Sequence, residues 1–152
     1  MDFDLKAICD GLATRYAIAG LNGSKPVGAE SIRAVYAQAP HSMPTTPAMV
    51  FMPQDGTTVE AASQTYTVTA NIDLLVYFAK RSGDIPRSET QRQLWIGPLL
   101  AQGFDITTRT LGGAVKSALP GSWEFLELPY GDVSYDGIKI TFEAIVRDVA
   151  TS

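Results

Sequence analysis

The clearest pattern in the chain is an alternation of apolar and polar residues between Gln64 and Phe78. A period of two is typical of an antiparallel strand with one face on the core and one face open. At about 3.4 Å per residue this segment would extend about 50 Å, well beyond the length of a common strand. We therefore expect one end to bend at a bulge or to project as an arm against which another chain packs. The apolar positions are Tyr66, Val68, Ala70, Ile72, Leu74, Val76 and Phe78, and the polar ones are Thr65, Thr67, Thr69, Asn71 and Asp73.

The rest of the chain predicts three helices and three further strands. The first helix is capped by Asp2 or Asp4 and runs to Tyr16, and a shorter helix lies within Ala29–Gln38. A strand follows over Ala48–Met52 and is ended by a turn at Gln54–Thr57, and the long strand breaks at Ser82–Asp84. The third helix starts at a capping box of Ser88 and Gln91 and stops at Gly103, and the last two strands, Trp123–Leu128 and Ile138–Val149, are joined by a loop over Tyr130–Gly137.

This order of elements predicts an α+β fold. Helices and strands are grouped rather than regularly alternating, and both long strands have one apolar face. We therefore expect a mostly antiparallel sheet of about four to five strands with helices packed on one face. The length of 152 residues fits a single domain over residues 1–152.

Charge and composition narrow the function classes. The net charge is −4 and the bases are scattered apart from Lys80-Arg81, whereas nucleic-acid binders cluster Lys and Arg against phosphates. We expect no sequence-specific nucleic-acid binding. No apolar run has the roughly 20 residues that cross a bilayer, so we expect no membrane association. The acidic N-terminus does not resemble a signal peptide, which predicts a protein made in the cytosol.

Candidate chemistry is sparse. His41 is the only histidine and lies between prolines, where an exposed loop is expected, and no Gly-x-Ser-x-Gly elbow presents a serine to it. Cys9 falls on the apolar stripe of the first helix, where packing is the expected role. Glu124 and Glu127 are typical of a solvated face. We therefore predict no catalytic residue, no metal site and no cofactor.

Four segments carry a resemblance to a known family: Met1–Ile8, Ser82–Trp95, Ser117–Phe125 and Leu128–Gly131. They resemble tail terminator proteins, the tail-completion proteins of long-tailed bacteriophages. The resemblance is one of size, element order and general texture, and it covers nearly the whole chain.

The resemblance implies a structural virion protein in the tail or neck, assembled in the host bacterial cytoplasm. It implies a homo-oligomer, a hexameric ring that caps the tail tube, ends its polymerisation and offers a joining surface to the head–tail connector protein, with DNA able to pass through the ring. A ring needs two different patches on each subunit. We expect the oligomer or partner interface to include Val59, Thr65, Thr67, Thr69, Asn71, Arg87, Tyr130 and Tyr135.

Two alternatives remain open at this stage. One is another ring-forming virion component, such as a head–tail adaptor or a different neck or tail-completion protein. The other is a small enzyme that uses carboxylates in a cleft, which predicts a deep pocket and shifted carboxyl pKa values.

Overall fold

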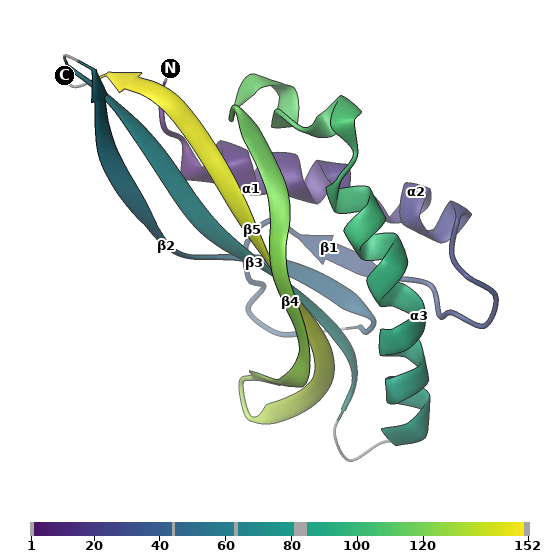
Figure 1. Cartoon of the computed structure of the whole chain (residues 1–152). Helices are drawn as coiled ribbons and strands as arrows, with labels where there is room; N and C mark the ends of the chain where they lie inside the picture. Colours follow the sequence, from purple (N-terminus) through teal and green to yellow (C-terminus); the bar gives the residue numbers. More distant parts are fainter. Residues whose placement is uncertain (1, 44, 63, 81–84, 151–152) are drawn as a thin grey trace.

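A computed structural model describes residues 2–43, 45–62, 64–80 and 85–150, and of positions 62, 80, 85–88 and 106 it describes the backbone alone (Figure 1). Five strands form one sheet in the order β1-β2-β3-β5-β4, in which only the β1–β2 pair is parallel. The predicted α+β fold with a mostly antiparallel sheet is confirmed. The strands are β1 (Ala34–Tyr36), β2 (Ala48–Ala62), β3 (Thr65–Lys80), β4 (Ser117–Tyr130) and β5 (Val133–Ala150), and the helices are α1 (Leu5–Arg15), α2 (Ile18–Gly23), α3 (Ile85–Gly103) and two short 3₁₀ turns, η1 (Ile106–Thr108) and η2 (Leu111–Gly113).

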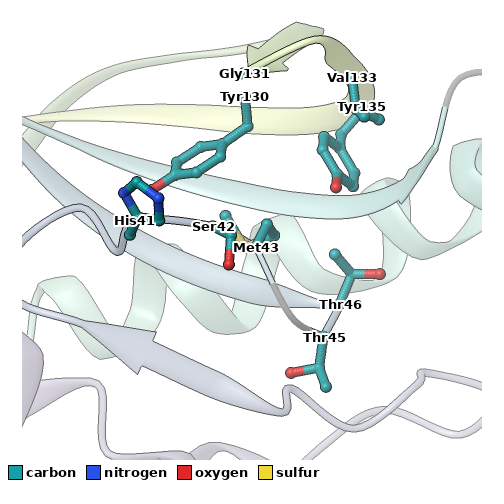
Figure 2. A pocket seen from close by; sticks show the side chains of 9 residues that line it. All are labelled: His41, Ser42, Met43, Thr45, Thr46, Tyr130, Gly131, Val133 and Tyr135. Atoms are coloured by element: carbon teal, nitrogen blue, oxygen red, sulfur yellow. The ribbon is translucent and has the colours of Figure 1, made fainter.

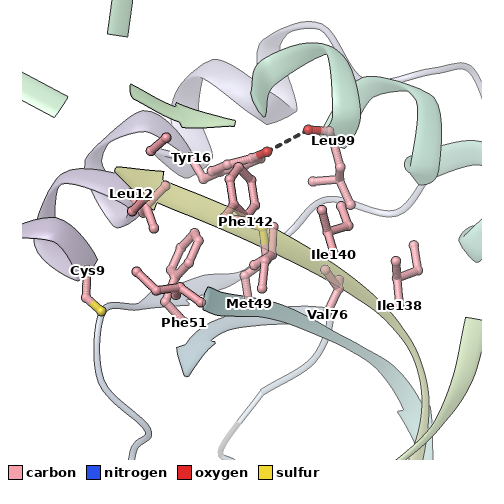
Figure 3. Close-up of a cluster of buried hydrophobic side chains, with 14 of the residues drawn as sticks. Cys9, Leu12, Tyr16, Met49, Phe51, Val76, Leu99, Ile138, Ile140 and Phe142 are labelled. Atoms are coloured by element: carbon pink, nitrogen blue, oxygen red, sulfur yellow. Dashed lines mark hydrogen bonds between the residues drawn. The ribbon is translucent and has the colours of Figure 1, made fainter. Parts of the chain in front are cut away.

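Helices α1 and α3 share the main hydrophobic core with one face of the sheet (Figure 3). Tyr16 at the end of α1 packs against the rings of Phe51 and Phe142, and its hydroxyl donates a 2.7 Å hydrogen bond to the carbonyl oxygen of Leu99 in α3. The predicted apolar face of β3 is buried from Ala70 to Phe78. Helices therefore cover one face of the sheet, as expected.

Helix α1 begins where the sequence predicts. The Asp4 carboxylate caps it by accepting a 3.1 Å bond from the backbone N–H of Ala7. At its other end Arg15 is buried, and its guanidinium donates to the carbonyl oxygens of Gly103, Thr108 and Ala118. One side chain thus holds the end of α3, the η1 turn and the start of β4 together.

The predicted helix within Ala29–Gln38 is wrong. Residues 34–36 form β1, and residues 29–33 before it have no regular secondary structure. Asn22 bonds both the N–H and the carbonyl of Ile32, and Gln91 of α3 accepts from the N–H of Glu30. Because distant side chains satisfy these backbone groups, the segment has no need of helical bonds.

The predicted end of the strand at Met52 is also wrong. Strand β2 continues through Pro53 to Ala62, and the expected turn at Gln54–Thr57 is a bulge, where the register against β3 shifts between Pro53 and Asp55. At the other end of the sheet, the predicted loop over Tyr130–Gly137 is reduced to a hairpin turn at Gly131 and Asp132, with Gly131 at a φ of 60°.

Helix α3 starts at Ile85, so Ser88 lies inside it rather than at a capping box, and the helix ends at Gly103 as predicted. The predicted strand break at Ser82–Asp84 lies outside the described residues. Among the described residues, no helix is both long and apolar enough to cross a membrane.

Candidate interaction surface

Three long strands run together and form an arm. Its tip extends beyond the helices, whereas Ala70, Ala144 and Val146 in its lower part are buried in the main core. The arm comprises residues 55–62 of β2, 65–71 of β3 and 143–150 of β5, which pair with each other across β3. Eight residues at about 3.3 Å each give the arm a length of about 26 Å. In Figure 1 it reaches the upper left, away from α2 and α3, with the end of β5 at its tip. All β2 residues from Pro53 to Ala61 are exposed.

The outer edge of β2 is unpaired along the arm. Strand β1 pairs only with Ala48, Met49 and Val50, and beyond Val50 no described strand lies on that side. An exposed strand edge offers backbone N–H and C=O groups to another chain, and proteins usually protect such edges. Here Pro53 removes one donor and the bulge beside it interrupts the edge. The remaining stretch to Ala62 has no such protection.

One face of the arm is polar and belongs to both β2 and β3. Val59 pairs with Thr67, Thr57 with Thr69, and Asp55 with Asn71, and partners in an antiparallel ladder share a face. Asn71 Nδ2 donates a 2.7 Å bond to Asp55 Oδ1. Val59 is 62% exposed in this polar setting. The polar face of the arm thus carries one exposed apolar side chain among threonines.

Two hollows flank the base of the arm. On the helix side, Phe3 and Leu5 lie against residues 53–58 of β2 around a hollow of about 310 Å³. A second, more apolar groove of about 500 Å³ lies between α1 and the unpaired edge of β2. Its lining residues are Leu5, Lys6, Cys9, Ala37, Gln38, Ala39, Phe51, Met52 and Pro53.

A cluster of tyrosines occupies the opposite end of the sheet. Tyr77 packs edge-on against Tyr130 and Tyr135, with ring centroids 5.5 and 5.6 Å apart. Burial, then the neighbouring tyrosines, raise the pKa of Tyr77 to about 12. The Tyr130 hydroxyl donates to the carbonyl oxygen of Pro40, which fixes the loop that carries His41.

A pocket of about 390 Å³ lies beside this cluster (Figure 2). It presents hydroxyl groups from Ser42, Thr45, Thr46 and two tyrosines, together with the His41 ring. None of the described residues that line it is a carboxylate or a lysine. A Ser–His pair normally needs a carboxylate or amide to orient the imidazole, and this pocket provides neither.

Among the described residues, two carboxyl groups have shifted pKa values, and both are on the surface. Hydrogen bonds from Lys6 and Gln38 lower the pKa of Asp10, and bonds from Thr107 lower that of Asp105. Both shifts run opposite to the raised pKa that a general acid needs. Burial raises the pKa of the Cys9 thiol, which weakens it as a nucleophile. Among the described residues, no three His, Cys, Asp or Glu side chains gather as metal ligands would.

The structure brings together five of the eight predicted interface residues. Val59, Thr65, Thr67, Thr69 and Asn71 all lie on the arm or at its base. Tyr130 and Tyr135 lie at the other end of the sheet, where Tyr135 is only 5% exposed in the single chain. Arg87 is in α3, and its side chain lies outside the described residues. The interface role of all eight remains a prediction.

Sequence reasoning missed the outer strand of the arm. Asp55, Thr57 and Glu60 are exposed on the unpaired edge, yet the prediction placed the first two in a turn. The β-branched run Thr57-Thr58-Val59 is the signal that favours a strand there.

A scan against protein-family models finds no match for the chain, and a search of the curated proteins finds no significant match.

Proposed function

We propose that this chain is an assembly protein whose copies join head to tail into a ring. The observation that carries the proposal is the arm, which extends about 26 Å and whose outer β2 edge has no partner among the described residues. A single chain gains little from so much exposed sheet, because unpaired edges invite aggregation. A neighbouring subunit that covers the edge removes that cost.

The ring serves as the tail terminator of a long-tailed bacteriophage. In this role it caps the tail tube, ends polymerisation of the tube protein and offers the other side of the ring to the head–tail connector. The support for this finer role is the resemblance of the four sequence segments together with an α+β fold that carries helices on one side of a sheet.

Binding to purified virion parts tests the role. Tail tubes and DNA-filled heads of the phage that encodes the chain are each mixed with the protein, pelleted, and viewed by negative-stain electron microscopy. A terminator binds one end of the tube and halts further growth when tube subunits are added. Binding to heads but not to tubes would instead identify a head–tail adaptor, and binding to neither would remove both roles.

A further inference from the structure

The two opposite edges of the sheet carry opposite charge at the same level of the arm. The edge strand β2 carries Asp55 on the polar face of the arm and Glu60, paired with Tyr66, on the other face. Strand β2 contains neither lysine nor arginine. The N-terminal side chains Asp2 and Asp4 are exposed and flank Phe3, which lies against this part of β2. This set of four carboxylates is called the acidic edge below.

The other edge of the sheet begins with two bases. Lys116 immediately precedes β4, and its backbone N–H bonds the carbonyl oxygen of Ile145 on β5. Arg109 lies beside it, since its carbonyl accepts from the N–H of Ala118. Both side chains are exposed, and neither forms an ion pair with another described residue. Arg109 and Lys116 are called the basic corner below.

The strand register places the basic corner opposite the middle of the acidic edge. Thr57 pairs with Thr69, Thr69 with Ile145, and Ile145 with Ser117, so these four residues form one line across the sheet. Lys116 is one residue nearer the tip, which is the level of Thr58, between Asp55 and Glu60. Two intervening strands keep the edges about 14 Å apart within one chain, so the charges cannot pair there.

Rotation about an axis along the strands brings the two edges of neighbouring copies together. Strands β2 and β4 are antiparallel to each other, because each step across β3 and β5 reverses direction. A closed ring has no translation along its axis, so residues at one level in the first copy stay level with those of the next. Nearer the base, Glu124 of β4 is level with Val50 of β2. Strand β1 pairs with β2 there, so the β4 edge of a neighbouring copy cannot reach β2 at that level. Among the described residues, only the arm leaves both edges open. There the acidic edge meets a corner with three exposed bases, Arg109, Lys116 and Arg147, and two exposed acids, Glu143 and Asp148.

We infer that the acidic edge of one copy docks on the basic corner of a second copy, and that this contact sets which edge meets which in the ring. The inference rests on the proposed assembly into a ring. Pro53 and Pro120 each lack an N–H on these edges, so side-chain charge rather than a full backbone ladder selects the contact.

Charge reversal followed by mixing tests the contact. The edge variant combines Asp2→Lys, Asp55→Lys and Glu60→Lys and keeps Asp4, which caps α1, so that both edges become basic. The corner variant Arg109→Glu with Lys116→Glu makes both edges acidic. Each variant alone should repel itself and weaken self-association on the order of tenfold or more, as for close like charges at an interface. An equal mixture should assemble again, since every edge then meets an opposite corner. All five substituted positions are exposed, so thermal melting should show that both variants fold.

Sedimentation velocity over a concentration series is the readout, with Asp132→Lys and Lys25→Glu as matched exposed controls at the hairpin turn and the α2 loop. If both charge-reversal variants assemble as well as the wild-type chain, or if mixing them does not restore assembly, the proposed contact is wrong. Either result would not contradict the ring itself. A wild-type chain that stays monomeric alone and on tail tubes would overturn both.

Discussion

We expect two positions on β3 to differ sharply in whether they tolerate a charged side chain. Ile72 is fully buried among the core residues, whereas Thr67 is half-buried on the polar face of the arm. We expect Ile72→Lys to unfold the domain, since burying an unpaired charge costs several kcal/mol. Thr67→Lys should change the free energy of unfolding by less than about 1 kcal/mol and mainly weaken assembly. Chemical denaturation of both variants measures this, and equal losses of stability would contradict the face assignment.

The alternation predicted the apolar face of β3 well but not the burial of its other face. Leu75 and Tyr77 stand on the polar parity and are nevertheless buried. A second cluster closes over them from the β4–β5 hairpin and from Met43. The local sequence does not predict the burial of Leu75 and Tyr77, because the side chains that cover them come from segments more than 30 residues away. Val68, by contrast, was expected in the core and is half-buried, since it lies where the arm leaves the helices.

Tyr77 makes stability sensitive to alkaline pH. Its pKa is raised to about 12 in the folded chain and lies near 10 when unfolded. The unfolded state therefore loses this proton first, so the stabilising effect is complete below pH 10 and is lost as pH rises toward 12. By pH 11 the loss is on the order of 1 kcal/mol. Denaturation at pH 8 and 11 should show a smaller pH effect in Tyr77→Phe, and an identical effect in both proteins would contradict it.

At the scale of elements, β2 depends on a glycine at its bulge. A Cβ on Gly56 would lie 2.4 Å from the backbone oxygen of Thr69 on the paired strand. We expect Gly56→Ala to force the two strands apart and cost about 1–3 kcal/mol, as overpacking does. Hydrogen exchange should accelerate in residues 53–62 while the core stays protected. Gly20→Ala is the control, because nothing lies within 4 Å of the added carbon. Unchanged exchange in β2 would contradict the prediction.

The element boundaries show which local sequence signals determine where a helix or strand ends and which are overridden by strand pairing. The end of α3 at Gly103 and the start of α1 at Asp4 followed from local chemistry, because a cap satisfies nearby backbone groups. Asp55-Gly56 is an equally strong local signal for a turn. Because the residues before and after it both pair with β3, the dipeptide lies at a bulge instead. Whether such a dipeptide turns or bulges depends on strand pairing that sequence alone does not display.

At the scale of the whole molecule, the sequence predicted an overlong strand but not the unpaired outer edge of β2 beside it. The unpaired length of β2 emerges only once β1 is seen to stop at Tyr36 and pair with three residues. The separation of acidic edge and basic corner likewise depends on strand order, because Glu60 and Lys116 are 56 positions apart in the chain. The predicted interface residues on β3 follow from the alternation pattern, whereas the β2 residues that pair with them do not.

The central claim is that the arm joins copies of this chain. Sedimentation velocity from micromolar to millimolar concentration tests it most directly, with the wild-type chain beside a variant in which residues 57–68 are replaced by a short turn. Thermal melting first confirms that the trimmed variant keeps the folded core. We predict that the wild-type chain forms a closed oligomer of defined size and that the trimmed variant stays monomeric. A wild-type chain that remains monomeric at every concentration, or a trimmed variant that assembles equally well, would contradict the account.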